Sequence, residues 1–314
     1  MLPLNSLKQL RYLVALSEQL NFTRAAAACF VTQSTLSAGL RELERVLGAR
    51  LVERNRQTVL MTPVGLDVAQ RAAAMLAEAQ DLVDTADRAR APLTGLLRLG
   101  VIPTIAPFLL PRCLALVRRR YPALRLALRE DLTAQLLARV ADGRLDLALI
   151  ALPFATGDLL VRPLFEDELR IVGLKSDPRL KSGVLALDPE LTDRLLLLEE
   201  GHCLREHALQ ACAAPARLAD AGVEATSLLT LVQMIESGFG IGLLPEMAIA
   251  GGLARSPRLV TRLLSRPPPS RTIAVVARRT TARLPDLRAL AEIFQQDGKS
   301  NAARPRHVRR RPGQ

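Results

Sequence analysis

The sequence predicts an α/β protein in which a small helical module and one long helix precede two lobes of alternating strands and helices. Three observations lead to this fold class. Leu36, Leu40, Leu43 and Leu47 recur at the spacing of one helix face. A heptad pattern runs through residues 68–86. From residue 96 onward, short apolar runs alternate with helical segments, which is typical of a parallel sheet covered by helices.

The formal net charge of +12 is unevenly distributed along the 314 residues. Residues 1–62 carry eight Lys and Arg against four Asp and Glu, an excess that suits a nucleic-acid-binding module. The end of the chain carries five Arg after residue 300 and no acidic residue. This composition predicts a basic, disordered tail over residues 298–314, which either attracts phosphates non-specifically or has no role.

The cysteine and hydropathy patterns bear on the compartment. Apolar runs are interrupted by charges before the ~20 residues that a membrane span needs, and the N-terminus lacks the layout of a signal peptide. Four cysteines in so long a chain do not form a disulfide scaffold. We therefore expect a cytoplasmic protein without a membrane segment, in which any internal disulfide would be transient.

The pattern of the N-terminal module predicts a helix-turn-helix at about residues 22–41. We expect an amphipathic helix over 7–18, a second helix capped by Thr23 and a third helix that begins at Ser34. Small alanines at 25–28 allow two helices to cross closely, and the third helix is placed to enter a major groove. The candidate DNA-contacting residues are Thr32, Gln33, Ser34, Thr35, Ser37 and Arg41, with Arg54 and Arg56 in the segment that follows.

Residues 51–61 predict a wing, because two short apolar strands flank residues 55–57. Arg54 and Arg56 suit phosphate or minor-groove contacts there. We place the DNA-binding domain at residues 5–62. An ordinary three-helix domain with a hairpin is the alternative, but it explains the exposed, Arg-bearing face less well.

A long helix over residues 63–91 is the next expected domain, starting with a proline suited to a first helical turn. It contains two heptad series, which are Val68, Met75, Leu82 and Ala72, Ala79, Ala86. This seam packs either on its own chain or on a second copy. Dimerisation is favoured because paired DNA half-sites compensate for the weak binding of a single recognition helix.

Residues 92–297 predict the two α/β lobes. Strands over 96–102, 124–128 and 145–152 alternate with helices in the first lobe. Residues 164–174 are expected to cross into the second lobe, and residues 271–277 to return. This gives subdomain I at about 92–165 and 270–297 and subdomain II at about 166–269. The cleft between such lobes is the usual place for a ligand.

The segment GHCLREHALQAC places Cys203 at a predicted helix N-terminus, beside His202 and Arg205. Free backbone N–H groups, the helix dipole and cations favour a thiolate, and in such settings a thiol pKa can fall to roughly 3.5–7.5. We therefore expect a reactive thiol, since the thiolate is the form that a peroxide oxidises to sulfenic acid.

Cys212 lies nine residues after Cys203. In one continuous helix that spacing corresponds to a rise of about 13.5 Å, whereas a disulfide needs Cα atoms within roughly 7 Å. The pair can bond only if the segment leaves the helix. From spacing alone, two buried packing cysteines are the commoner interpretation, and Cys29 and Cys113 also read that way. A zinc site of His202, Cys203, His207 and Cys212 is a further alternative, although the spacing fits no common pattern.

The N-terminal half of the chain carries a family resemblance. The stretch NFTRAAAACFVTQSTLSAGLRELERVLGARLVERNRQTVLMTPVG resembles the winged helix-turn-helix of LysR-type transcriptional regulators, and the similarity continues to about residue 297. This resemblance implies a linker helix and a periplasmic-binding-protein-like effector domain of two Rossmann-like subdomains. It also implies promoter DNA and RNA polymerase as partners, and a homotetramer built from dimers.

The effector domain is similar to one branch of that family, the hydrogen-peroxide sensors. The matching stretches are IPTIAPFLLP, GHCLREHALQAC, ATSLLTL and RRTIAVV. By this resemblance Cys203 is the peroxidatic cysteine and Cys212 the resolving one. The resemblance places Thr104, Thr133, His202, Arg205 and Arg271 around the reactive thiol; His207 lies outside the motif and is not carried over. The implied function is a peroxide-responsive activator of antioxidant-defence genes that cellular thiols reset.

Two rival functions come from other interpretations of the same residues. One is a LysR-type regulator that responds to a small organic effector bound between the subdomains. The other is an enzyme, a thiol peroxidase with an accessory DNA module. The long helix and the two-lobe layout argue against an enzyme, as does the lack of a Gly-rich phosphate loop and of Gly-x-Ser-x-Gly. We expect no metal and no cofactor.

Overall fold

The computed structural model describes residues 7–54, 59–88, 93–181, 183–212, 224–265 and 267–302. The chain divides into two compact units. The first comprises residues 1–91, 138–145 and 280–282, and the second comprises residues 92–137, 146–279 and 283–314.

The N-terminal unit contains the predicted helix-turn-helix. Its elements are α1 (Leu7–Gln19), α2 (Phe22–Ala28), α3 (Gln33–Leu47), β1 (Val52–Arg54), β2 (Val59–Met61) and α4 (Pro63–Arg88). The Asn21 side chain accepts a hydrogen bond from the Arg24 amide and caps α2, so the predicted cap at Thr23 is wrong. Thr32 caps α3 through the Thr35 amide, so this helix begins one residue before Ser34.

Leucines of α3 form the centre of this unit. Leu36, Leu40 and Leu43 are buried, but Leu47 is 39% exposed, so the predicted buried face is wrong at its last member. The reason is that α3 ends at once: Gly48 adopts a φ of 65° and turns the chain away. The strands β1 and β2 pair antiparallel as the predicted wing. Residues 55–58, including Arg56, and the side chain of Arg54 lie outside the described residues.

Helix α4 presents two kinds of residue along its length. Ala69 and Ala72 are buried in the core of the helix-turn-helix, and Val68 packs against it. Met75 and Leu82 of the heptad seam are 47% and 75% exposed in the single chain. None of the described helices combines the length and the apolar character that crossing a membrane requires.

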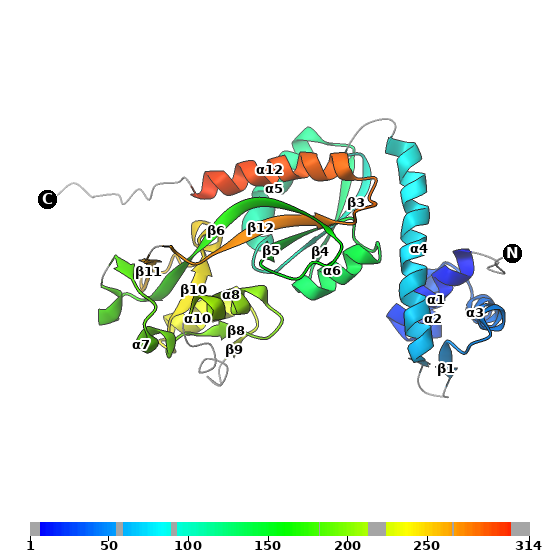
Figure 1. Cartoon of the computed structure of the whole chain (residues 1–314), viewed down its shortest axis with the longest axis horizontal. Helices are drawn as coiled ribbons and strands as arrows, with labels where there is room; N and C mark the ends of the chain where they lie inside the picture. The colour runs from blue at the N-terminus through cyan, green and yellow to red at the C-terminus, as the bar shows by residue number, and fades with distance from the viewer. Residues whose placement is uncertain are drawn as a thin grey trace. The chain divides into compact units, whose positions relative to one another are not determined.

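The first lobe of the second unit is built on three parallel strands. These are β3 (Gly95–Val101), β4 (Leu124–Glu130) and β5 (Leu147–Leu152), with β3 in the centre. The helices are α5 (Ala106–Arg120), α6 (Thr133–Ala141) and α12 (Leu284–Ala302), and α12 runs along α5 (Figure 1). Helix α12 continues to Ala302, five residues past the boundary at 297 that the sequence suggested.

Two long strands join the lobes, and they make the sheet mixed rather than parallel as predicted. Strand β6 (Leu160–Leu174) pairs antiparallel with β12 (Ser270–Ala277) through its first half. Through its second half it pairs antiparallel with β10 (Gly242–Pro245) and β11 (Leu259–Leu264). Figure 1 shows β6 and β12 side by side. Strand β6 runs from the first lobe into the second. Strand β12 returns to the first lobe beside it, and it therefore runs in the opposite direction.

The second lobe contains mostly short elements. They are η1 (Pro178–Leu180), β7 (Val184–Leu185), α7 (Pro189–Thr192), β8 (Leu197–Leu198), α8 (Cys203–Ala211), β9 (Glu224–Ala225), α10 (Leu228–Glu236) and α11 (Glu246–Ala250). Helix α8 contributes to two separate hydrophobic clusters. Leu204 belongs to the cluster that includes α10, whereas Ala208 and Cys212 belong to the cluster that includes Leu185 and Leu191.

Candidate functional site

Helix α8 begins directly after a tight turn that only glycine fits. Strand β8 is buried and pairs parallel with β9, and Gly201 then adopts a φ of 91°. A Cβ added at Gly201 would meet only the flexible end of the Leu132 side chain, Cδ1 at 2.9 Å, so the backbone conformation is what favours glycine. His202 is the N-cap residue of α8 and Cys203 is its first helical residue, as the sequence predicted.

The Cys203 thiol is free and only 4% exposed. Burial raises the pKa of this thiol above its ordinary value, while Arg271, the Thr133 hydroxyl and the backbone N–H groups of Cys203 and Leu204 lower it. The lowered pKa expected from the helix N-terminus is therefore wrong for this folded state, because desolvation outweighs the dipole and the cation. The Arg271 charge, the Thr133 hydroxyl and the two backbone N–H groups nevertheless all favour the thiolate form.

This raised pKa makes a prediction about alkylation. We expect iodoacetamide to modify Cys203 more slowly in the folded, reduced protein than in the urea-unfolded protein at pH 7–8. The rate should keep rising as the pH passes the ordinary thiol range of about 8.5, because the folded thiol ionises later. Mass spectrometry of the Cys203 peptide across pH provides the measurement. A rate that reaches its plateau below pH 7 would contradict the assignment.

Arg271 is the central cation of the site and is 1% exposed. Its Nη1 donates to Thr104 Oγ1 at 2.7 Å, and its Nη2 donates to the Thr104 carbonyl at 3.1 Å. Its Nε and Nη2 donate to Asp167 Oδ2 at 3.1 and 3.0 Å. Thr104 and Arg271 therefore come together, and the Arg271 charge acts on Cys203.

Asp167 is a site residue that the sequence analysis missed. It is 3% exposed, pairs with Arg271 and accepts a hydrogen bond from the Met247 amide at 2.9 Å. Asp167 stands directly opposite Arg271 in the β6–β12 register. Asp167 lies between Glu166 and Glu168, and nothing in the sequence distinguishes it from these neighbours until the partner strand is known.

Thr133, at the first position of α6, is 1% exposed. Its hydroxyl lies near the Cys203 sulfur and favours the thiolate, yet Thr133 Oγ1 forms no hydrogen bond of regular geometry within the described residues. The Thr133 hydroxyl is therefore placed to interact with the sulfur or with a group bound to it.

Arg205 and His202 are both buried at the start of α8. The Arg205 guanidinium donates to the Leu198 carbonyl at 2.9 Å and to Glu224 Oε1 at 2.5 Å. It therefore ties α8 to β8 and β9, and it is not among the groups that shift the Cys203 pKa. The His202 ring is buried, with Nε2 3.7 Å from Glu199 Oε1.

His207, which the sequence analysis set aside, is a buried side chain on the same helix as Cys203. It lies one helical turn after Cys203, is 4% exposed and is influenced by the Arg271 charge, as Cys203 is. Burial, together with Arg271, lowers the pKa of His207 to about 4. The helical spacing of four from Cys203 was the signal that could have identified it.

Cys212 is separated from this site. It follows α8 as its C-cap residue, is 4% exposed and lies in the hydrophobic cluster with Leu197 and Ile241. Burial raises the pKa of its thiol, opposed by the Thr192 hydroxyl. Cys29 and Cys113 are buried as well, and burial raises the pKa of Cys113 to about 12. The described residues contain no group of three His, Cys, Asp or Glu side chains spaced to hold a metal ion.

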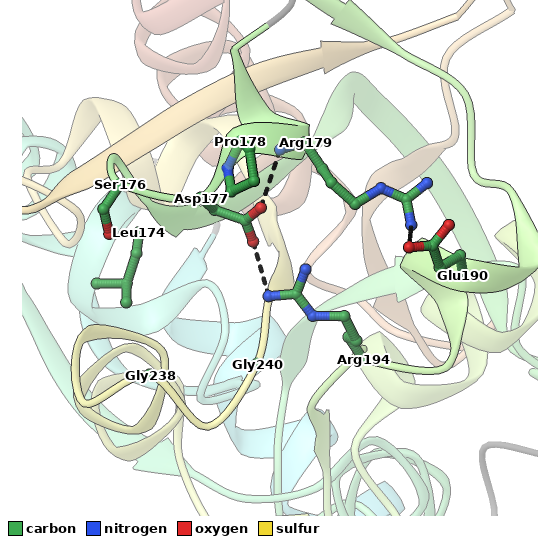
Figure 2. Close-up of a pocket in the computed structure, with 9 residues that line it drawn as sticks. All are labelled: Leu174, Ser176, Asp177, Pro178, Arg179, Glu190, Arg194, Gly238 and Gly240. Atoms are coloured by element: carbon green, nitrogen blue, oxygen red, sulfur yellow. Dashed lines mark hydrogen bonds and ion pairs between the residues drawn. The ribbon is translucent and has the colours of Figure 1, made fainter.

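A cavity of about 420 Å³ lies elsewhere in the second lobe, around η1 and α7. Figure 2 shows its charged side chains turned toward one another. Arg194 Nη2 donates to Asp177 Oδ2 at 2.7 Å, and Arg179 Nη1 lies 2.5 Å from Glu190 Oε1. None of the predicted site residues lines this cavity. Its charges are mutually neutralised, so it offers no net charge for a charged ligand.

The candidate DNA-contacting residues lie at the start of α3. Thr32, Gln33, Ser34, Thr35 and Arg41 are exposed, and Ser37 is half-buried. The Thr32 hydroxyl is engaged with Ser34 Oγ at 2.9 Å and with Thr35 Oγ1 at 2.8 Å, so its main role in the free chain is capping. Gln33, Thr35 and Arg41 remain as exposed polar side chains of the predicted recognition helix.

Two family models match this chain. The LysR substrate binding domain covers residues 90–299, and the bacterial regulatory helix-turn-helix protein, lysR family, covers residues 7–66. The HTH-type transcriptional regulator EstR of Acinetobacter baylyi is 44% identical over 296 residues, which is 94% of this chain and 98% of the relative. A probable hydrogen peroxide-inducible genes activator of Streptomyces viridosporus is 42% identical, over 93% of this chain and 94% of the relative. A full-length OxyR variant structure from Pseudomonas aeruginosa matches with a TM-score of 0.77 and 33% identity, over 92% of this chain and 97% of that one.

Proposed function

Because this chain belongs to the LysR family of transcriptional regulators, we propose that it senses hydrogen peroxide through a reversible Cys203–Cys212 disulfide and controls antioxidant-defence genes. Its similarity to peroxide-inducible activators and to OxyR structures supports this sensing role. The helix-turn-helix binds DNA. In this proposal the domains are residues 5–62 for DNA binding, 63–91 for dimerisation and 92–297 for sensing.

The observation that carries the proposal is the separation of two buried free thiols by an intact helix. Cys203 begins α8 beside Arg271 and Thr133, and Cys212 ends it inside another hydrophobic cluster. Nine helical residues rise about 13.5 Å, which exceeds the roughly 7 Å between Cα atoms that a disulfide tolerates. Joining the thiols therefore requires α8 to unwind and Cys212 to leave its cluster.

The chemistry proceeds in two balanced steps. The Cys203 sulfur attacks one peroxide oxygen, the O–O bond breaks, and the other oxygen takes the thiol proton and leaves as water. The sulfur is oxidised by two electrons and the peroxide is reduced by two. The Cys212 thiol then attacks the sulfenic sulfur, which forms the S–S bond and releases a second water. Two cellular thiols reduce the disulfide and reset the switch.

The residues around the sulfur have distinct roles in the proposal. Thr133 and Thr104 provide hydroxyls for the peroxide, and Arg271 stabilises the thiolate and the departing oxygen. Arg205 and His202 hold the start of α8, since the Arg205 guanidinium is committed to Leu198 and Glu224. Unwinding α8 would break these Arg205 hydrogen bonds and change the packing of the second lobe. Repacked subunits of a dimer or tetramer would then alter half-site spacing and the contact with RNA polymerase.

Arg41 offers a separate test of the DNA-binding surface. We expect Arg41→Ala to weaken operator binding by roughly 1–3 kcal/mol if it contacts a base, or to reduce the salt dependence by about one ion if it contacts a phosphate. Arg45→Ala is the matched control, because Arg45 lies one turn later in α3 and pairs with Glu42. Fluorescence anisotropy with labelled operator DNA at several salt concentrations measures both. Equal operator affinities and salt dependences for Arg41→Ala and the wild type would show that Arg41 does not contact the DNA.

A footprint of the reduced and peroxide-treated protein on its own upstream DNA tests the proposed function. The proposal requires that micromolar peroxide change the protected region and that a dithiol reverse the change. An identical footprint in both states, with Cys203 demonstrably oxidised, would refute redox control of DNA binding.

One observation favours a second candidate, a regulator of the same family that responds to a small organic effector between the subdomains. The relative EstR, at 44% identity, is named as a transcriptional regulator without reference to peroxide. A Cys203→Ser/Cys212→Ser double variant separates the two candidates. A ligand-dependent footprint in that variant would support the organic effector, whereas loss of all responses would support the thiol switch.

A further inference from the structure

His207 has a chemical property that the proposed mechanism leaves unused. Its ring is 4% exposed, and neither Nδ1 nor Nε2 forms a hydrogen bond of regular geometry within the described residues. Buried polar side chains nearly always have a partner, either in the protein or in a bound small molecule. The described residues therefore leave hydrogen-bonding capacity on this buried ring unused, and a bound small molecule can use it.

The ring stays neutral over the range in which the protein functions. Burial and the Arg271 guanidinium lower the pKa of His207 to about 4, while the Pro153 carbonyl acts in the opposite direction. A neutral imidazole has one N–H donor and one lone-pair acceptor. The Pro153 carbonyl favours the N–H on its side of the ring, which leaves the other nitrogen as an acceptor.

The acceptor nitrogen shares its surroundings with the reactive thiol. Cys203 and His207 are four residues apart, so they lie on the same face of α8. Arg271 acts electrostatically on both side chains. Thr133 Oγ1, whose hydroxyl also acts on the Cys203 sulfur, likewise lacks a regular hydrogen bond among the described residues. His207 and Thr133 are thus two buried polar groups with unused hydrogen-bonding capacity in the region where Arg271 acts on Cys203.

We propose that His207 binds the peroxide directly, accepting a hydrogen bond from one of its O–H groups while Thr133 engages the other oxygen. This inference rests on the proposed function, because it assigns a further residue to the same peroxide site. Hydrogen peroxide matches the site chemically: it has two donors and two acceptors, and it is as compact as two water molecules. His207 orients the O–O bond toward the sulfur and remains neutral throughout.

The ring also selects among oxidants. A molecule that lacks an O–H beside the reacting oxygen cannot satisfy the His207 acceptor, and a bulky hydroperoxide must place its alkyl group against buried side chains. We therefore expect the contribution of His207 to be larger for hydrogen peroxide than for tert-butyl hydroperoxide. Sites built to hydrogen-bond a substrate discriminate strongly against analogues that leave their buried polar groups unpaired.

The test compares His207→Leu and His207→Gln with the wild-type full-length chain. Reduced protein is mixed with hydrogen peroxide, quenched with an alkylating agent at set times, and the Cys203 peptide is quantified by mass spectrometry. We expect His207→Leu to lower the second-order rate constant roughly 100-fold, as removal of one oriented hydrogen bond in a reacting site does. His207→Gln should retain most of the rate, because an amide also offers an acceptor beside a donor.

Two further measurements separate a peroxide contact from a structural role. Leucine leaves no unpaired nitrogen in the buried site, so His207→Leu should unfold at the same urea concentration as wild type or a higher one. Its Cys203 should react with iodoacetamide at the wild-type rate, because that reagent does not need the His207 contact. Gln210→Ala, an exposed change on the same helix, is the matched control and should leave every rate unchanged.

The outcomes distinguish this inference from the proposed function. If wild-type Cys203 is not oxidised by peroxide, the proposed function fails irrespective of His207. If the wild type is oxidised and His207→Leu is oxidised equally fast, the proposed function stands and the His207 contact is refuted. A His207→Leu protein that loses peroxide and iodoacetamide reactivity in equal proportion would assign His207 a structural role and likewise refute the contact.

Discussion

Replacing Cys203 by serine is expected to abolish the peroxide-dependent change in the DNA footprint and to leave the footprint of the reduced protein unchanged. Serine has nearly the same size as cysteine, so we expect the variant to retain the fold. The hydroxyl oxygen cannot form the sulfenic acid that the first step requires. The loss should be complete at any peroxide concentration that leaves the remaining thiols intact.

Two matched variants give this prediction its controls. Cys113→Ser changes a buried thiol in α5 that lies outside the site, and it should respond to peroxide like the wild type. Cys212→Ser should still form a sulfenic acid at Cys203, which dimedone labels, but should form no internal disulfide. A peroxide-dependent footprint that persists in Cys203→Ser would show that another group senses the oxidant.

Replacing Arg271 by methionine is expected to destabilise the reduced protein by about 3–5 kcal/mol, because it leaves the Asp167 carboxylate buried without its partner. Urea unfolding of the reduced protein measures this loss. Arg271 also provides the positive charge near the Cys203 sulfur, so peroxide oxidation of the folded variant should slow by roughly 100-fold or more.

A double variant separates these two consequences. Arg271→Met with Asp167→Leu replaces the buried ion pair by apolar side chains, and such replacements are often neutral or stabilising. We expect the double variant to regain most of the lost stability without regaining its reactivity toward peroxide. Recovery of both properties would show that Arg271 serves the fold alone. Failure to regain stability would mean that the hydrogen bonds to Thr104 and Met247 matter more than the buried charges.

Local patterns predicted the N-terminal module well, because its structure depends on short-range spacing. The leucines of α3, the small residues of α2 and the proline at the start of α4 each determine structure within a few residues. The pattern failed at Leu47, where the helix end at Gly48 opens the last turn to solvent. It also failed at the cap of α2, where Asn21 and Thr23 were both suitable by residue type.

The effector domain was predictable only in part, because its strand order is decided by long-range pairing. The parallel strands β3, β4 and β5 follow from the alternation of strands and helices. The antiparallel pairing of β12 joins residues about one hundred positions apart, and no local signal specifies it. Two-residue strands such as β7 carry too few residues for any pattern.

The same contrast between local and long-range interactions explains which features of the site could be predicted from the sequence. Local sequence placed Cys203 at a helix start, but its pKa depends on burial by other segments, which local reasoning could not supply. Asp167 becomes visible only through its register with Arg271, and His207 only through the side of α8 that faces Arg271. Arg205 sits in the motif beside the thiol, yet its long side chain reaches Glu224 instead.

Peptide mapping of the oxidised protein tests the central claim most directly. Trypsin cleaves after Arg194, Arg205 and Arg217, so Cys203 and Cys212 fall in separate peptides, residues 195–205 and 206–217. After treatment of the reduced full-length chain with equimolar peroxide, the account predicts that these two peptides become joined by a disulfide that a dithiol releases. Hydrogen exchange should show that α8 loses its protection in the same sample. A joined pair with α8 still protected, or oxidation of Cys203 that never joins it to Cys212, would contradict the account.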